Sequence, residues 1–344
     1  MPKRKSGTAY IFNAPSAQAS IEERADYLEL LALRDRILGA SEQSLIEIIG
    51  RGTEEEAEGE AAFGGVEAER ELETEADDAF NELQQRIQHL GPAADCYPFE
   101  IKGNGKVKGD RLQLRADWNR KNDRWLYVFC LLATRLNMQN DREHDGLNGT
   151  ELFEEFCLHV AWSYFGGGGA KPVGKLLFGT ARQRLQWSNK RSPSQSQFGA
   201  HVNELCKKIG EGSYFRSKDP KQTLRPKDDK LDVVVWRSFS DQMPGKLIAF
   251  GQCKTGSNWP DDISQLQPHS FCLNWMHDQP PVPIVRLFFV TARVPNIRFY
   301  LSSYAGIFFD RCRLLEFADA LPEDLKRRCH RWALAALRKH GVKF

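Results

Sequence analysis

The chain has 344 residues, of which 41% are hydrophobic and 27% are charged, and its formal net charge is +2. This is the composition of an ordinary globular protein with room for two domains. The near-neutral charge excludes a uniformly basic protein, so any surface that binds nucleic acid has to be a local patch.

The cysteines and the hydropathy predict a location inside the cell. Eight cysteines are scattered along the chain, and none forms a C-x-x-C pair. This scatter indicates buried thiols in a reducing compartment. The basic start, Met-Pro-Lys-Arg-Lys, is not followed by an apolar stretch, and no segment approaches the ~18 apolar residues of a membrane span. We therefore expect a cytoplasmic protein without a membrane anchor.

The first part of the chain is expected to be mostly helical. A capping box at Ser20–Glu23 predicts a helix to about Gly39, and a second helix follows over 42–49. Residues 54–78 are rich in Glu and Asp, which predicts a solvated helix or a flexible acidic segment, with a nucleic-acid mimic or a partner-binding tail as the alternative. The remaining pattern predicts a helix, a hairpin and a helix at 77–90, 99–115 and 123–136.

A polar stretch at 138–149 predicts the boundary between two domains. The expected division is a mostly helical domain with a small hairpin over 1–145 and an α/β domain over 146–344. The first domain is expected to act as a sensor, a specificity module or a docking site for a protein partner.

The second part begins with a helix over 151–165, for which Thr150 is the expected N-cap. On a helical wheel, Glu154 lies at the edge of the apolar stripe, whereas Glu155 points to the opposite side. The run from Gly169 to Lys175 imitates a P-loop, but it follows a helix, and Leu176 stands where the loop needs Ser or Thr.

Two apolar stretches at 231–236 and 246–254 predict paired strands that carry polar side chains. Because side chains alternate along a strand, Gln252 and Lys254 share one face. In the right register, Asp232 meets them at one sheet surface, while Asp228 and Asp229 are rivals that lie before the apolar run. An acid, an amide oxygen and an ammonium at one place suit Mg²⁺ chemistry on phosphate.

Asp232 and the sequence Gln252-Cys253-Lys254 resemble the motif of the PD-(D/E)xK, or restriction-endonuclease-like, nuclease superfamily. The resemblance is to the variant with Gln in place of the second acid, as in Mrr-type restriction enzymes. It covers about 150–275, which is less than half of the chain. It implies an α/β fold, a restriction-endonuclease-like core with a central mixed β-sheet flanked by helices.

The resemblance also implies roles for these residues. Asp232, the Gln252 amide oxygen and the Cys253 backbone carbonyl would bind Mg²⁺, or Mn²⁺ in its place. Lys254 would hold the attacking water and stabilise the transition state. Phe153-Glu154 resembles the acidic element that many members carry on the first core helix, so Glu154 would complete the metal site.

Further basic stretches could contact nucleic acid. The first contains Arg182, Arg184, Lys190 and Arg191, and others lie at 207–225 and on the helix expected at 322–340, with solvated loops or a capping helix as the alternative. The expected function is Mg²⁺-dependent hydrolysis of DNA, by analogy in prokaryotic restriction or anti-phage defence. The alternatives are a catalytically silent nucleic-acid-binding or scaffold subunit and an RNA-cleaving effector. Dimerisation, which lets both strands be cut, is expected by the same analogy.

Overall fold

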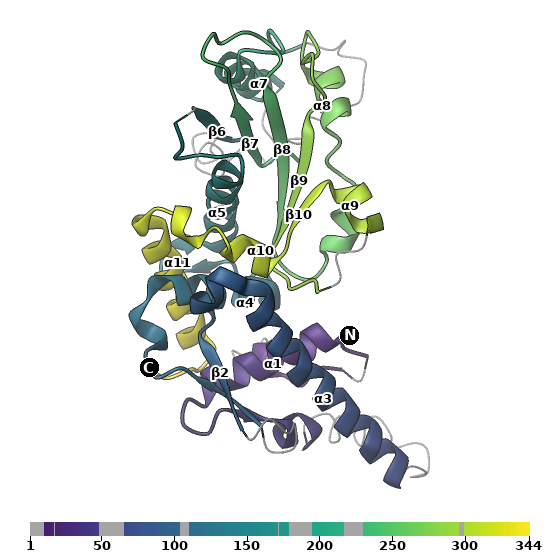
Figure 1. The fold of residues 1–344 in the computed structure, drawn as a ribbon, viewed down its shortest axis with the longest axis vertical. Coiled ribbons are helices and arrows are strands. Elements are labelled where there is room, and N and C mark those ends of the chain that lie inside the picture. Colours follow the sequence, from purple (N-terminus) through teal and green to yellow (C-terminus); the bar gives the residue numbers. More distant parts are fainter. Residues whose placement is uncertain are drawn as a thin grey trace.

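A computed structural model describes residues 10–16, 18–47, 65–103, 110–170, 172–178, 195–216, 230–295 and 299–344. The fold is mixed α/β, with a five-stranded mixed sheet in the order β10-β9-β8-β7-β6. In Figure 1 this sheet occupies the upper half, while α1, α3 and a small sheet occupy the lower half. No described helix has the length and apolarity that a membrane span requires.

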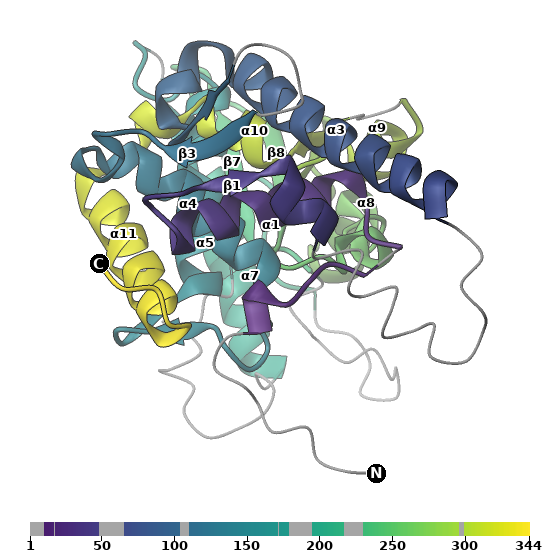
Figure 2. The ribbon, with the colours of Figure 1, turned by 90° about the horizontal axis from the view of Figure 1, so that it is seen from below.

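The elements before residue 145 are mostly helical. The helices are α1 (Ile21–Arg34), α3 (Gly65–Leu90) and α4 (Asn122–Arg135), with 3-10 turns η1 (Tyr10–Phe12), η2 (Gly91–Cys96) and η3 (Trp118–Arg120). The strands are β1 (Ala40–Ser41), β2 (Phe99–Lys102), β3 (Arg111–Leu114) and β4 (Glu143–His144). The predicted hairpin is confirmed, because β2 and β3 pair antiparallel. Figure 2 shows β1 and β3 beside α1 at this end of the molecule.

The elements after residue 145 build the large sheet and its cover. The strands are β5 (Leu147–Asn148), β6 (Val173–Leu177), β7 (Val233–Arg237), β8 (Leu247–Lys254), β9 (Val285–Val290) and β10 (Ile307–Phe309). The helices are α5 (Gly149–Tyr164), α7 (Gln195–Ile209), α8 (Pro268–Trp275), α9 (Phe299–Ala305), α10 (Arg311–Leu315) and α11 (Glu323–Lys339), with 3-10 turns η4 (Trp259–Asp262) and η5 (Ala318–Ala320).

Alternation along the central strands buries both faces of the large sheet. Val233 and Val235 of β7 belong to the same core cluster as Phe153 of α5. Their neighbour Val234 belongs to a second cluster with Phe198 of α7. The sheet is therefore covered by α5 on one face and by α7 and α8 on the other.

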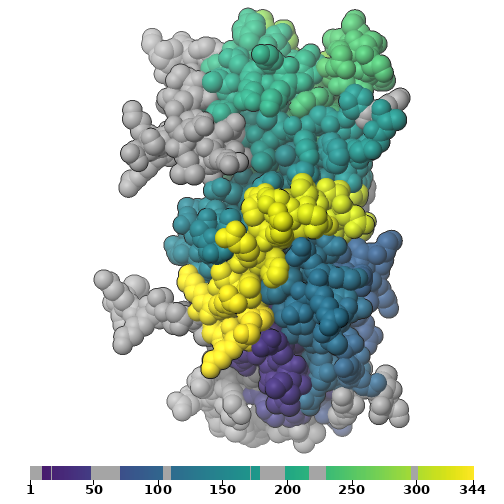
Figure 3. Space-filling view, turned by 90° about the vertical axis from the view of Figure 1, so that its left-hand side faces the viewer, coloured from purple at the N-terminus to yellow at the C-terminus, as the bar shows by residue number. Residues whose placement is uncertain are grey.

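One hydrophobic core continues across residue 145. Its buried members include Leu28 of α1 and Phe129 of α4, and also Val235 of β7 and Trp332 of α11. Figure 3 shows the C-terminal segment, in yellow, lying between the blue N-terminal elements and the teal sheet region. The two parts of the chain are thus packed together by shared apolar burial.

Three local predictions differ from the structure. The first helix ends at Arg34, because the Asp35 carboxylate accepts from the next N–H groups and turns the chain. The helix expected from residue 77 begins at Gly65 as α3, so the described end of the acidic segment is helical, which is one of the forms predicted for it. Residues 54–64 lie outside the described residues. The N-cap of α5 is Asn148, whose side chain accepts from the N–H groups of Thr150 and Glu151. The short turn η4 precedes α8, which starts at Pro268, a residue suited to a first helical turn.

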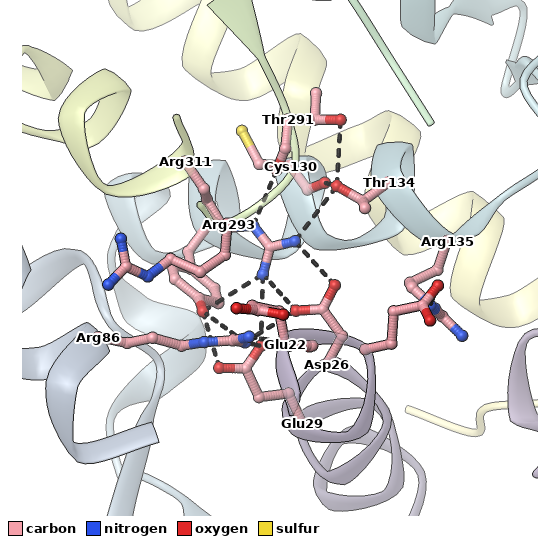
Figure 4. Close-up of polar contacts among 12 residues, drawn as sticks. Glu22, Asp26, Glu29, Arg86, Cys130, Thr134, Arg135, Thr291, Arg293 and Arg311 are labelled. Carbon is pink, nitrogen blue, oxygen red and sulfur yellow. Dashed lines mark hydrogen bonds and ion pairs between the residues drawn. The ribbon is translucent and has the colours of Figure 1, made fainter. Parts of the chain in front are cut away.

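A cluster of buried charges joins the two parts, and we call Asp26, Glu29, Arg86, Tyr127 and Arg311 the buried arginine cluster (Figure 4). Arg311 makes a bidentate pair with Asp26, with Nη1–Oδ1 and Nη2–Oδ2 distances of 2.8 and 3.1 Å. Arg86 Nη1 lies 2.8 Å from both Asp26 Oδ1 and Glu29 Oε2. Burial opposes ionisation of Asp26, but the charges of Arg311 and Arg86 outweigh it and lower the pKa of Asp26 to about 2.

His159 of α5, beside Lys175 of β6, makes the stability of the protein depend on pH. Lys175 Nζ lies 3.0 Å from His159 Nδ1, and burial together with the Lys175 charge lowers the pKa of His159 from 6.5 to about 4. Because the pKa of His159 is lower in the folded than in the unfolded state, the neutral imidazole contributes to the free energy of unfolding. This contribution is complete above about pH 6.5 and is lost as the pH falls toward 4. The melting temperature of His159→Gln should therefore fall less than that of the wild type across this window. The exposed His277→Gln is the control, and equal slopes for His159→Gln and the wild type would contradict the assignment.

Candidate functional site

The predicted motif lies where β7 and β8 meet at one end of the sheet. The two strands pair antiparallel, with Val233 opposite Gly251. Asp232 directly precedes β7 and continues this pairing, because its N–H donates to the Gly251 carbonyl at 2.9 Å. The register therefore brings Asp232 next to the Gln252–Lys254 stretch, as the sequence predicted.

The Asp232 carboxylate is held by the backbone of β8. Its Oδ2 accepts a hydrogen bond of 2.7 Å from the N–H of Cys253. The carboxylate accepts from this N–H just before Val233, the first residue of β7, where the regular strand begins. An ionised acceptor makes such a bond strong, so the carboxylate is fixed at the end of the strand pair.

Glu154 and Glu155 of α5 point in different directions, as the helical wheel predicted. Glu155 makes a bidentate ion pair with Arg328 of α11, at 2.7 and 2.8 Å. Glu154 is only 7% exposed. Burial of the sulfur raises the pKa of the Cys253 thiol, and among the further causes are the charges of Asp232 and Glu154. Both carboxylates therefore lie close to Cys253.

Gln252 is the least satisfied polar side chain of the motif. It is 1% exposed, and neither Oε1 nor Nε2 has a hydrogen-bond partner among the described residues. Its neighbour across the parallel pair is Phe288, which is completely buried. Leaving a buried polar group without a partner costs about 1–3 kcal/mol.

Lys254 pairs with an acid that the sequence analysis did not select. Its Nζ lies 2.7 Å from Asp262 Oδ2, and both side chains are partly exposed. Asp262 is the last residue of the turn η4, eight positions after Lys254. Neither spacing nor periodicity gives a signal for this pair, because the contact depends on how the loop after β8 folds back.

A cavity of about 560 Å³ opens beside Lys254. Its lining consists of Tyr10, residues 134–139, Thr150, residues 253–259 and Asp262. Asp232, Glu154 and Gln252 do not belong to this lining, so Lys254 and Cys253 connect the cavity with the rest of the motif.

The described side chains at this site offer a cation fewer than three acidic ligands. Across the described ranges, no group of three or more His, Cys, Asp or Glu side chains is arranged to hold a metal ion. The predicted site needs the amide oxygen of Gln252 and a backbone carbonyl beside the two carboxylates. A hard cation accepts neutral carbonyl oxygens as ligands, and the Gln252 amide has no partner among the described residues. Alternation along β8 turns this amide to the face of Phe250 and Phe288, opposite the face on which Cys253 packs with α5, so the strand register brings Gln252 to Asp232 but not to Glu154.

Two of the three predicted basic stretches, that from Arg182 to Arg191 and that on the C-terminal helix, have different outcomes. Arg182, Arg184, Lys190 and Arg191 lie outside the described residues, as do the rival acids Asp228 and Asp229. On α11, Lys326, Arg327, Arg328, Arg331 and Lys339 all pair with carboxylates. The described contacts of α11 are thus those of a capping helix.

The cysteines are free, and seven of the eight are buried, as the sequence predicted. Comparisons of the chain with protein-family models, with curated proteins and with solved structures return no match.

Proposed function

We propose that the protein is a metal-dependent nuclease with a restriction-endonuclease-like core that hydrolyses phosphodiester bonds of DNA. The observation that carries this proposal is the buried, unpartnered amide of Gln252, two residues before Lys254 and next to Asp232. An amide in this state is costly unless a ligand completes it. Mg²⁺, or Mn²⁺, is the ligand that the neighbouring carboxylates suit.

Each residue has a task that follows from its chemistry. Asp232 and Glu154 supply negative oxygen ligands, and Gln252 with the Cys253 carbonyl supplies neutral ones. A bound Mg²⁺ would lower the pKa of water and polarise the phosphoryl oxygen. Lys254 holds water by its ammonium group and stabilises the charge that develops on the phosphate. Asp262 keeps that ammonium in place at 2.7 Å.

By analogy with the nucleases that the motif resembles, the role would be prokaryotic restriction or anti-phage defence in the cytoplasm. The residues before 145 would act as a sensor or partner-docking module, and a homo-oligomer would allow both strands to be cut. DNA is preferred to RNA on the same analogy, and substrate tests separate the two.

One observation favours a second function, a silent nucleic-acid-binding or scaffold subunit. Asp232 is engaged by the Cys253 N–H and Lys254 by Asp262, so both already have protein partners. A silent subunit would not bind a divalent cation at this place. Metal binding therefore discriminates between the two proposals.

Adjacent glutamates provide a matched test of the metal site. In a titration of the purified full chain with Mn²⁺, followed by electron paramagnetic resonance, Glu154→Gln should weaken binding by about 10- to 100-fold. Asp232→Asn should do the same, because it removes the other carboxylate. Glu155→Gln is the control, since Glu155 pairs with Arg328. Equal affinity in all variants, or no Mn²⁺ binding by the folded wild type, would favour the silent subunit.

A further inference from the structure

The cavity beside Lys254 is built by two distant parts of the chain. One wall is the loop after β8, residues 255–259, and the other is the end of α4 with the following residues 136–139. The Gly256 N–H donates to the Ala133 carbonyl at 2.9 Å and holds the loop against α4. Gly256 has φ 83°, a conformation that glycine adopts without strain.

Arg135 places a second positive charge in this cavity. It also lines an adjoining hollow of about 300 Å³, which shares Thr134, Arg135, Ser257 and Trp259 with the first. The adjoining hollow is also lined by Glu22, Glu23 and Asp26 of α1, so the candidate groove is the first hollow, between α4 and the loop after β8. In Figure 4, Arg135 stands apart from the contacts that join Arg86 and Arg311.

The ion pair of Arg135 is weak, so its guanidinium can leave Glu23 and bind a phosphate instead. Its Nη1 lies 3.3 Å from Glu23 Oε1, and the Glu23 side chain is 43% exposed. A partly exposed ion pair of this kind contributes little to stability. The neighbouring Thr134 is held by the Arg311 Nη2 at 3.2 Å, so the wall that carries Arg135 is anchored to the buried arginine cluster.

Trp259 gives the groove an aromatic surface. The ring is partly buried, packs against Phe308 at a centroid distance of 5.3 Å and lines both hollows. The groove carries Arg135, Lys254 and a single carboxylate, Asp262, beside this ring. Positive charges next to an aromatic ring are the combination that binds single-stranded nucleic acid. A volume of about 560 Å³ lies within the range of small-ligand pockets, which suits one nucleotide and not a duplex.

We propose that this groove binds an unpaired nucleic-acid strand, with Arg135 and Lys254 on its phosphates and a base on Trp259. Arg135 is then a nucleic-acid-binding residue contributed by the N-terminal part of the chain. The inference deepens the proposed function by naming the state of the strand at the site, unpaired and drawn out of the duplex that is cleaved, and it rests on that function for what happens to the bound phosphate.

Binding is measured by fluorescence anisotropy of a labelled short oligothymidylate with the full chain in EDTA, so that cleavage does not contribute. Arg135→Gln should weaken binding by about tenfold and reduce the slope of log K against log salt by about 0.7. Asp262→Asn should strengthen binding, because it removes the negative charge beside Lys254. An unlabelled duplex of the same length should compete less well than the single strand.

Two ion-paired surface residues serve as controls. Arg327→Gln on α11 removes a positive charge, as Arg135→Gln does. Asp145→Asn removes a negative charge that pairs with Arg331 of α11, as Asp262→Asn removes the one beside Lys254. If Arg135→Gln behaves like Arg327→Gln, or Asp262→Asn like Asp145→Asn, the groove is not the binding site. Preference for the duplex would overturn the single-strand assignment. Because these experiments require neither metal nor cleavage, they can fail or succeed independently of the nuclease proposal.

Discussion

Arg311→Met is expected to lower the free energy of unfolding by about 3–5 kcal/mol, the range for breaking a buried ion pair from one side. Arg311 is completely buried and binds both oxygens of Asp26. Its Nε also donates to the Thr291 carbonyl at 3.0 Å. Without the guanidinium, Asp26 keeps only Arg86 of the two arginines that lower its pKa most. Chemical denaturation followed by circular dichroism measures the loss.

Two variants control this prediction. Arg327→Met removes an exposed arginine that pairs within α11, and its effect should stay below about 1 kcal/mol. Adding Asp26→Leu to Arg311→Met should recover part of the stability, because it removes the carboxylate left behind. A loss for Arg311→Met no larger than that for Arg327→Met would show that the buried arginine cluster does not join the two parts of the chain.

Lys254→Met is expected to lower the rate of DNA cleavage by about 10²- to 10³-fold, the effect of removing one preorganised group that stabilises the transition state. Methionine keeps most of the length of the side chain and removes its charge. Mn²⁺ binding should persist, because Lys254 is not a proposed ligand. Initial rates on plasmid DNA and the Mn²⁺ titration measure the two effects separately.

The control for Lys254→Met is Lys102→Met, which removes an exposed lysine paired with Glu100 on β2. Its rate should equal that of the wild type. If Lys254→Met cleaves at the rate of Lys102→Met, Lys254 has no role in the chemistry.

Periodicity in the sequence predicted the elements that carry the motif. The alternation around Val233–Arg237 and the apolar run ending at Lys254 became β7 and β8, and the stripe on 151–165 became α5. The capping box at Ser20 is present as predicted. These features depend on neighbours in sequence, so local patterns are sufficient to find them.

Features that depend on tertiary contacts could not be predicted in this way. The strand β6 starts within the run that imitates a P-loop, and its Gly174 packs directly against Trp236. Arg86 and Arg311 have the pattern of solvated charges, and only the fold brings both to Asp26. Asp262 and Arg135 likewise gain their place beside the motif from loop and helix packing.

The burial of Gln252 was partly predictable. Its position after an apolar run indicated a buried strand, but the sequence could not show that its amide has no partner among the described residues. That result depends on every element packed around β8, and it is the observation on which the proposed function rests.

Cleavage of supercoiled plasmid DNA by the purified full chain, with Mg²⁺ or with EDTA, tests the central claim most directly. Asp232→Ala and Lys254→Ala are assayed beside the wild type. The account predicts cleavage by the wild type in Mg²⁺ that is lost in EDTA and in both variants. Cleavage that persists in EDTA or in both variants would contradict the claim that this site is a metal-dependent nuclease centre.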